Sequence, residues 1–496
     1  MIQRNIAEVQ PWRLIVGEVL ELLTELASKG IKLSFEGADL KCYAPKGSLT
    51  KEISDSIARH KPEIVNRLRD YVDFQASLSL VSTRGKTYGT SRASSAVEER
   101  RVPPVDPPLD LAAEATLDPD IQPPAPNGDE ADFTAARTIL LTGASGFLGA
   151  YLLYELMKTT EACVYCLVRC RSESDGAERI KKNLLKYGLW NDDFAPRVIP
   201  VPGDLAQPLL GLGTETFDKL CDVIDTVYHN GAVVNFIYSY NSLKDSNVRG
   251  TQEVIRLACR VKRKPMHFIS TIGVFPPTTK TDTKVLESSA PTNWQGLTAG
   301  YPQSKWVAER MVMIAAERGL PVRIYRPGFV TGDSTTGIWN TDDFLARMIK
   351  GCIQLGSAPD MDAMIEMVPV DYVSKAIVHL SRQPEVQSNV FHVVGRRYIP
   401  VGELFRIICS LGYKIVLVPY PEWRKLLFDD AKTSSKNALY PLLTGFAGGP
   451  PLQMPAFDCR QTLEGLKGTQ LTCPEIDTNL IGTYLTYLKD SGFLDC

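Results

Sequence analysis

The sequence has no uninterrupted hydrophobic run that approaches the roughly 18 residues needed to cross a bilayer. Its charges nearly cancel, with 55 Lys and Arg residues against 57 Asp and Glu. This balance argues against a protein that coats nucleic acid or anionic membranes. Charged residues also interrupt the N-terminal segment from Met1 to Leu23, which is therefore not a signal peptide. We predict a soluble, cytoplasmic protein that binds neither nucleic acid nor membrane.

Metal-ligating residues lack the spacing of a metal site. The five histidines lie at positions 60, 229, 267, 379 and 392. The eleven cysteines are odd in number and lie mostly in apolar segments, which indicates reduced, buried thiols. Cys163 and Cys166 form a Cys-x-x-Cys pair, but residues three apart on a strand point to opposite faces. We predict no metal site.

Proline content divides the chain. Residues 82–101 are rich in Ser, Thr, Arg and Glu, and residues 103–126 contain eight prolines. Such a stretch buries too little apolar surface to offset the entropy lost on ordering. We predict a disordered, Pro-rich linker over residues 76–133, which joins a small N-terminal domain over residues 1–75 to a large C-terminal part.

The N-terminal domain combines helical and strand patterns. Apolar residues recur at helical spacing from Val16 to Leu26. Apolar and polar residues then alternate over 31–35 and again over 40–44, which predicts a β-hairpin. Helical spacing returns after Thr50 and after Pro62. The domain contains no nucleophile, carboxylate pair or glycine-rich loop, so the residues predict a small α+β interaction domain.

The segment Leu26–Gly37, followed by Leu40 and by Ala44–Thr50, resembles the N-terminal docking domains of hybrid nonribosomal peptide and polyketide megasynthases. This type was first described in the tubulysin assembly line. The resemblance implies that the hairpin receives the C-terminal tail of an upstream megasynthase subunit, and strand addition would suit a free edge. Because such domains are often dimeric, it also implies a homodimer through the docking domain. The alternative is an accessory domain with a solvated basic face.

A glycine-rich loop opens the C-terminal part. A short apolar run after Arg137 leads into this loop, and helical spacing resumes directly after it. A strand, a glycine turn and a helix start place backbone N–H groups and the positive end of a helix dipole against a pyrophosphate. The spacing is GxxGxxG, the form seen in extended short-chain dehydrogenases. We expect a dinucleotide to contact Thr142, Gly143, Ser145, Gly146, Phe147, Leu148 and Gly149.

The end of the next strand should decide which cofactor binds. There the sequence has Arg169, where an Asp or Glu would bind a ribose 2′-hydroxyl. A guanidinium binds a phosphate through two hydrogen bonds, so we predict NADPH rather than NADH. Arg179 on the following helix is either a second phosphate ligand or a solvated helix residue.

Two further strand patterns end in residues suited to a cofactor. An aspartate at the end of 197–204 would accept a hydrogen bond from the adenine amine, and a turn of small residues ends 226–232. Strands that alternate with helices predict an α/β, doubly wound parallel sheet of the Rossmann type. The expected contacts from these two ends are Asp204, Leu205, Asn230, Gly231 and Ala232.

A hydroxyl, a phenol and an amine form the candidate catalytic set. Thr271 lies at the carboxyl end of a buried-strand pattern, and thirty residues later Tyr301 and Lys305 lie one helical turn apart on one face. A phenol has a pKa near 10, but a neighbouring ammonium and the nicotinamide charge stabilise its phenolate. The Thr271 hydroxyl would orient a carbonyl or hold its oxygen as negative charge develops.

The whole set resembles the short-chain dehydrogenase/reductase superfamily, in which Thr271, Tyr301 and Lys305 match the Ser/Thr-Tyr-Lys triad. By the same resemblance Lys305 also binds the nicotinamide ribose, and Pro327 and Gly328 pass along the nicotinamide. Within that superfamily, residue 134 to the end resembles thioester reductase domains, which release products reductively from nonribosomal peptide synthetases. The matching motifs run from the glycine loop through Arg326-Pro-Gly to the C-terminal stretch 473–494.

This resemblance implies an NADPH-binding Rossmann domain over 134–338 and a smaller substrate-binding part over 339–496, of which about 365–395 return to the core. It implies reduction of a peptidyl or acyl phosphopantetheine thioester to an aldehyde, with further reduction to an alcohol left open. The sequence contains no Gly-Gly-x-Ser carrier motif. The carrier domain is therefore expected on the upstream megasynthase subunit.

Two alternatives stay open. One is a sugar-nucleotide or small-carbonyl reductase or epimerase of the extended short-chain dehydrogenase type. The other is a catalytically silent docking scaffold that keeps a cofactor site for stability. An intact Thr271, Tyr301 and Lys305 argues against the scaffold, because a scaffold has no need of all three.

Overall fold

The computed structural model describes residues 109–125, 136–235, 238–278, 284–384, 389–433, 437–446 and 453–494, together with 32–36, 39–43 and three residues near position 55. The chain separates into two compact units, Met1–Pro104 and Val105–Cys496.

The first unit contains the predicted hairpin. Strands β1 (Lys32–Glu36) and β2 (Asp39–Tyr43) pair in antiparallel register, with Leu33 opposite Cys42 and Phe35 opposite Leu40. This register brings together the positions that the alternation assigns to one face, so the hairpin prediction is confirmed. Ser54, Ser56 and Ile57 are helical, and the rest of the predicted helices lie outside the described residues.

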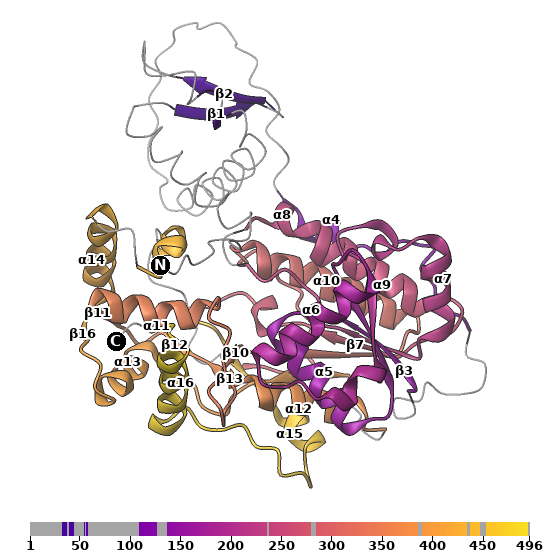
Figure 1. Ribbon diagram of the computed structural model, residues 1–496. Coiled ribbons are helices and arrows are strands. Elements are labelled where there is room, and N and C mark those ends of the chain that lie inside the picture. Colours follow the sequence, from indigo (N-terminus) through magenta and orange to yellow (C-terminus); the bar gives the residue numbers. More distant parts are fainter. Residues whose placement is uncertain are drawn as a thin grey trace, which may run out of the picture. The chain divides into compact units, whose positions relative to one another are not determined.

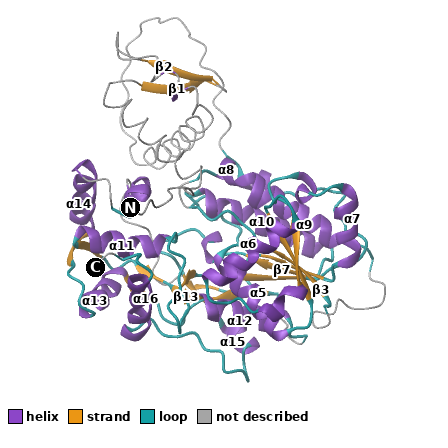
Figure 2. Cartoon of the chain, in the orientation of Figure 1, coloured by secondary structure: helices purple, strands orange, loops and turns teal. Residues whose placement is uncertain are grey.

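The second unit is built around a seven-stranded sheet (Figures 1 and 2), in which every neighbouring pair is parallel. The strand order is β14-β9-β7-β6-β3-β4-β5. The order reverses between β3 and β6, which makes a crevice at the carboxyl ends of these strands. The predicted doubly wound α/β fold is confirmed. The strands are β3 (Thr138–Thr142), β4 (Cys163–Val168), β5 (Val198–Pro202), β6 (Thr226–His229), β7 (Met266–Ile269), β9 (Val322–Pro327) and β14 (Val390–Val393).

Helices cover both faces of the sheet, which explains why its central strands are buried along their whole length. One apolar core holds residues of α5 (Phe147–Thr159), α6 (Glu173–Lys186) and α12 (Val370–Ser381). The core on the other face holds residues of α7 (Thr214–Val223), α9 (Gly250–Cys259) and α10 (Gly300–Glu317).

A third apolar core lies in the C-terminal part, around the fully buried Trp339 and Trp423. It is formed by helices that Figure 1 shows grouped beside the sheet. These helices are α11 (Phe344–Leu355), α13 (Val401–Ser410), α14 (Tyr420–Thr433) and α16 (Thr478–Asp490).

Two stretches of the C-terminal part return to the sheet. The first runs from β13 (Met367–Pro369) through α12 to the edge strand β14, and β13 pairs with β10 (Phe329–Thr331). The second contains β17 (Ala456–Phe457), which pairs with β8 (Lys284–Val285), and α15 (Arg460–Gly465).

The prediction of a disordered linker over 76–133 was wrong for residues 109–125, which we call the strap. The strap contains the short helix α4 (Leu111–Glu114), whose N-terminus is capped by the Asp110 side chain. Leu111, Leu117 and Ile121 are at most 5% exposed and belong to the core beneath α9 and α10. The high proline content of the region concealed these three anchors, because a composition average is insensitive to the spacing of a few apolar residues.

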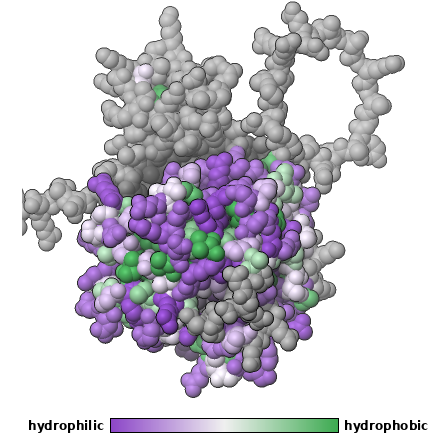
Figure 3. Space-filling view, turned by 90° about the vertical axis from the view of Figure 1, so that its right-hand side faces the viewer, coloured by the Kyte–Doolittle hydropathy of each residue, from purple (hydrophilic) through white to green (hydrophobic). Residues whose placement is uncertain are grey.

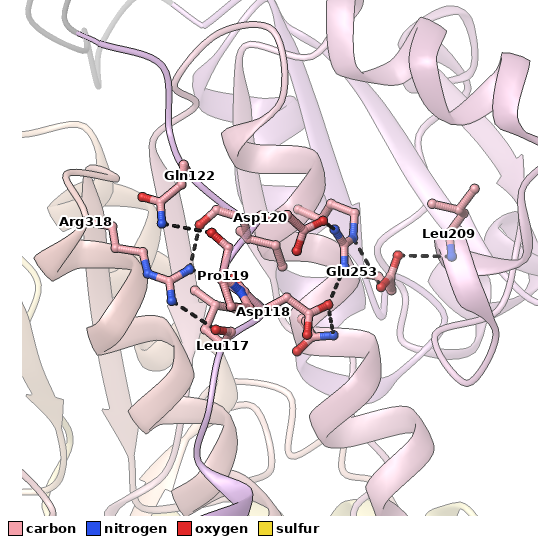
Figure 4. A network of polar contacts seen from close by, with 11 residues as sticks. Leu117, Asp118, Pro119, Asp120, Gln122, Leu209, Glu253 and Arg318 are labelled. Atoms are coloured by element: carbon pink, nitrogen blue, oxygen red, sulfur yellow. Dashed lines mark hydrogen bonds and ion pairs between the residues drawn. The ribbon is translucent and has the colours of Figure 1, made fainter.

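Two arginines outside the strap, Arg318 and Arg256, bind it through hydrogen bonds and ion pairs. Arg318 donates hydrogen bonds to the carbonyl oxygens of Leu117 (2.9 Å), Asp118 (2.7 Å) and Ile121 (2.7 Å), as Figure 4 shows. Arg256 forms ion pairs with Asp118 (2.6 Å) and with a second strap aspartate. Arg318 therefore satisfies backbone carbonyl oxygens of the strap, and Arg256 neutralises two of its carboxylates.

No helix among the described residues is long and apolar enough to span a membrane. The face of the molecule in Figure 3 is mostly hydrophilic, with hydrophobic side chains in small patches.

We predict that Arg318→Ala lowers the free energy of unfolding of the second unit by about 2 kcal/mol, because three strap carbonyls lose a charged donor. The matched control is Arg260→Ala, which removes an exposed ion pair with Asp218 and should cost less than about 1 kcal/mol. Urea-induced unfolding followed by tryptophan fluorescence measures both free energies. Equal losses in the two variants would contradict a structural role for the strap.

Candidate active site

A cavity of about 900 Å³ lies at the carboxyl ends of the strands. It is lined by all three predicted catalytic residues and by every predicted cofactor residue except Thr142. Thr142 is fully buried behind the wall, where its hydroxyl accepts a hydrogen bond from the Gly231 N–H at 2.9 Å. The predicted residues in the lining are Gly143, Ser145, Gly146, Phe147, Leu148, Gly149, Arg169, Arg179, Asp204, Leu205, Asn230, Gly231, Ala232, Thr271, Tyr301, Lys305, Pro327 and Gly328.

The glycine loop needs its glycines for close approach. A Cβ on Gly143 would lie 2.7 Å from the Gly231 Cα, and one on Gly149 would collide with the Gly143 carbonyl oxygen. Helix α5 begins after Gly146 with no side chain capping its first N–H groups. These groups and the helix dipole therefore face the cavity, which suits a pyrophosphate. Asn183 of α6 fixes the loop, because its amide donates to the Gly146 carbonyl oxygen at 3.1 Å.

Arg169 and Arg179 lie at the rim of the cavity, beside the end of β4, and both are exposed. The Arg179 guanidinium donates to the Arg169 carbonyl oxygen at 2.6 Å. This bond connects α6 to the turn after β4. The two guanidinium groups therefore belong to one rim, and an anionic group bound there would meet both positive charges.

The catalytic candidates come from two elements that meet at the cavity. Thr271 follows β7, and its hydroxyl accepts a hydrogen bond from the Gly273 N–H at 3.1 Å. Tyr301 and Lys305 belong to the first turns of α10. The Lys305 ammonium donates to the Ile269 carbonyl oxygen at 2.8 Å and lies 4.1 Å from the centre of the Phe268 ring.

Burial shifts the titration of both α10 side chains. It lowers the pKa of Lys305 to about 7, although the carboxylate of Glu309 opposes the shift. It raises the pKa of the Tyr301 phenol, which is therefore protonated at neutral pH. The cavity thus presents a phenol that can donate a proton, a hydroxyl and an ammonium group, a combination suited to stabilising a carbonyl oxygen as it gains negative charge.

A buried ion pair behind the cavity was missed by the sequence analysis. Arg326 and Glu309 are fully buried and lie 2.6 Å apart. The other Glu309 oxygen accepts a hydrogen bond from the Ser270 hydroxyl. Arg326 also approaches His392 Nε2 at 3.1 Å and lies 4.9 Å from the centre of the Phe275 ring. The pair therefore connects β7, α10, β9 and β14.

One sequence signal for this pair was available. Glu309 lies four residues after Lys305, so both side chains project from the same face of α10 toward the site. Its partner Arg326 directly precedes Pro327 and Gly328, which line the cavity. Only the packing of α10 against the sheet shows that the two charges meet.

Asn247 connects the cavity wall to the catalytic helix. It lies in a π-helical turn, Asp245–Arg249, between α8 (Tyr240–Lys244) and α9. Its amide nitrogen donates to the Val233 carbonyl oxygen at 3.0 Å and to the Ser304 hydroxyl at 2.9 Å. The Ser304 hydroxyl in turn donates to the Tyr301 carbonyl oxygen at 2.8 Å.

His229 carries a defined hydrogen-bond chain beneath the glycine loop. The Thr251 hydroxyl donates to the Asn247 carbonyl oxygen at 2.6 Å, so it must accept the proton of His229 Nε2 at 2.9 Å. Nδ1 then accepts from the Thr142 hydroxyl at 2.7 Å. Burial lowers the pKa of His229 to about 3. The ring is therefore neutral and serves as a structural link rather than an acid or base.

Known families match both the N-terminal and the C-terminal part of the chain. Residues 141–377 match the NAD-binding family described as Male sterility protein, and residues 19–70 match the TubC N-terminal docking domain. The solved structure of the terminal R domain from the myxalamid PKS-NRPS biosynthetic pathway is 45% identical, with a TM-score of 0.72. That match covers 78% of this chain and 98% of the R domain.

The chain belongs to the terminal reductase domain family. A linear gramicidin synthase polypeptide of Brevibacillus parabrevis is 39% identical to this reductase over 87% of the chain. The L-2-aminoadipate reductase of Saccharomyces cerevisiae is 35% identical over 74% of the chain. The chain spans only 9% and 28% of the lengths of these two relatives.

Both resemblances inferred from sequence are thereby confirmed, the terminal reductase and the tubulysin-type docking domain. The reductase is an oxidoreductase with an NAD-binding domain. The open N-terminus of α5 and the close approaches of Gly143 and Gly149 fit such a dinucleotide. Among the described residues, no group of three or more His, Cys, Asp or Glu side chains is arranged to hold a metal ion.

We predict that Arg326→Met destabilises the reductase by about 3–5 kcal/mol, because Glu309 then becomes a buried carboxylate without its counter-charge. The double variant Arg326→Met/Glu309→Leu should be less destabilised than the sum of the two single variants by at least about 1 kcal/mol. Urea unfolding measures all three. The exposed pair Lys219 and Glu215 is the control, and its coupling should be much weaker than that of the buried pair. Additive losses at the buried pair would contradict the coupling.

Proposed function

We propose that this reductase releases a carrier-bound peptidyl or acyl chain by NADPH-dependent reduction of its phosphopantetheine thioester to an aldehyde. The observation that carries the proposal is the meeting of Thr271, Tyr301 and Lys305 in one cavity with the uncapped N-terminus of α5. Membership of the terminal reductase family supports the choice of a thioester substrate.

Different residues of the cavity lining would bind different parts of the cofactor. The first N–H groups of α5 would bind the pyrophosphate, and Asp204 would accept from the adenine amine. Arg169, with Arg179 beside it, would bind the 2′-phosphate of NADPH. Lys305 would bind the nicotinamide ribose. When bound, the nicotinamide would supply the hydride that reduces the thioester carbonyl.

The protein groups then act on the substrate oxygen. The Tyr301 phenol, held protonated by burial, donates to the carbonyl oxygen as negative charge develops there. The Thr271 hydroxyl is the second donor, and the Lys305 ammonium adds a positive charge nearby. The carbonyl carbon gains hydride and its oxygen gains a proton, which gives a thiohemiacetal. Its C–S bond then breaks, the hydroxyl proton passes to sulfur, and a free thiol and an aldehyde result.

The proposal places the carrier domain on an upstream megasynthase subunit. Residues 19–70 match a docking domain, which supports capture of an upstream subunit. The hairpin of β1 and β2 would receive the C-terminal tail of that upstream protein. Docking raises the effective concentration of the carrier near the cavity.

We predict that wild-type protein mixed with NADPH and a short acyl-pantetheine thioester releases thiol and forms an aldehyde. One NADPH consumed per thiol would mark the aldehyde as the final product, and two would mark an alcohol. Tyr301→Phe should lower turnover by about 10²–10⁴-fold while NADPH affinity changes little. Tyr154→Phe, on α5 outside the cavity, is the control and should match wild type.

Two outcomes would contradict the proposal. Full turnover by Tyr301→Phe would remove Tyr301 from the mechanism. Turnover of a free ketone or sugar nucleotide, without turnover of a pantetheine thioester, would favour a small-carbonyl or sugar-nucleotide enzyme on the same fold.

We predict that Arg169→Ala lowers the ratio of kcat/KM for NADPH to that for NADH by about 10- to 100-fold, because a charged hydrogen bond to the 2′-phosphate is lost. Steady-state kinetics with each cofactor measure the ratio. Arg171→Ala is the matched control, since Arg171 is exposed and does not line the cavity. An unchanged ratio in Arg169→Ala would reject the assignment of Arg169.

A further inference from the structure

Glu366 is a buried carboxylate that the proposed chemistry does not use. It lies between the short strand β12 (Met364–Ile365) and β13, and it is only 3% exposed. One carboxylate oxygen accepts a hydrogen bond from the Phe329 N–H at 2.9 Å. The other accepts from the Gly395 N–H at 2.6 Å. Glu366 therefore joins β10 to the loop after β14.

The carboxylate lies directly behind the cavity wall at Gly328. A Cβ added to Gly328 would collide with the Glu366 carboxylate, so that carboxylate occupies the space beside the Gly328 backbone. Gly328 and its neighbours Pro327 and Phe329 line the cavity, whereas Glu366 does not. The carboxylate therefore packs against a backbone segment that lines the cavity.

The charge of Glu366 is not neutralised by an ion pair among the described residues. Burial raises its pKa to about 7, and the two backbone N–H groups oppose the shift. Arg326, on the same segment, is already paired with Glu309. A carboxylate in this setting exerts a long-range field, because the surroundings contain little water to screen it.

We propose that Glu366 is a positioning residue that holds Pro327–Phe329 at the nicotinamide end of the cavity, and that its negative charge favours the cationic oxidised nicotinamide over the neutral reduced ring. The inference rests on the proposed function, together with the family resemblance by which Pro327 and Gly328 pass along the nicotinamide. Loss of hydride leaves a positive charge on the ring. A fixed negative charge behind the wall therefore lowers the energy of the oxidised state and favours hydride donation.

A purely structural role makes a different prediction. If Glu366 only satisfied the N–H groups of Phe329 and Gly395, its replacement would loosen the segment and weaken both forms of the cofactor alike. A charge that acts on the ring must instead discriminate between the two forms. The ratio of the two dissociation constants separates these cases, since the phosphates and adenosine are common to both forms.

The experiment measures the Kd of NADP⁺ and of NADPH by isothermal titration calorimetry at about pH 8. Glu366→Gln should weaken NADP⁺ relative to NADPH by about tenfold, because the glutamine side chain has nearly the same shape and no charge. Its NH₂ group cannot accept from a backbone N–H, but the loss of that one hydrogen bond affects both forms of the cofactor alike. Glu366→Asp keeps the charge and should keep the ratio within about twofold of wild type. Glu155→Gln is the matched control, since Glu155 is a buried glutamate of α5 outside the cavity lining. It should leave both constants unchanged.

A ratio in Glu366→Gln equal to that of wild type, in protein with a wild-type melting temperature, would overturn the inference. If that variant fails to fold, the two dissociation constants of wild type are measured between about pH 6 and pH 8.5 instead. The affinity for NADP⁺ relative to NADPH must rise as the carboxyl group ionises. Lys305 loses its proton over the same range and moves the ratio in the same direction, so an unchanged ratio would still overturn the inference.

The other titratable groups that face Glu366 keep their charge state over this range. Tyr372, Tyr398 and Cys473 have raised pKa values and stay protonated, and Arg396 is a further charged group that interacts with Tyr372 and Cys473. If wild type bound neither cofactor, the proposed function and this inference would both fail. Tight binding of both cofactors with an unchanged ratio would remove the inference alone.

Discussion

The buried ion pair between Glu309 and Arg326 determines how the two halves of the site meet. Glu309 lies one helical turn beyond Lys305, and Arg326 lies two residues before Gly328. Two desolvated charges are tolerated only when their geometry and remaining hydrogen bonds are satisfied, here with help from Ser270 and His392. The pair therefore restricts movement of α10 along β9. It fixes the position of Lys305 on α10 relative to Gly328, which follows β9.

Burial shifts the ionisable groups in and directly behind the cavity wall toward their neutral forms. It lowers the pKa of Lys305 and raises those of Tyr301 and Glu366. The local arrangement of these few groups matters more than the near-zero net charge of the chain. Lys305 and Glu366 therefore titrate near neutral pH, whereas the Tyr301 phenol stays protonated.

The strap is a proline-rich segment that is nevertheless part of a folded unit. Three apolar side chains reach the core beneath α9 and α10, and Arg318 binds the carbonyl oxygens between them. An average over the proline-rich region detects neither feature, because both depend on single positions. Residues 109–125 therefore belong to the reductase unit rather than to a linker.

The sequence by itself determined the elements whose signals are local. The glycine loop, the Tyr301–Lys305 spacing, the strand–helix alternation and the hairpin each lie within a few tens of residues, where periodicity and turn chemistry are readable. Only the tertiary structure decided the roles of Glu366, Arg326, His229 and the strap. Their partners lie far along the chain, and a lone glutamate or histidine has no pattern of its own. Each gains its role from burial beside a particular backbone or charge, which the packing of the sheet and its helices creates.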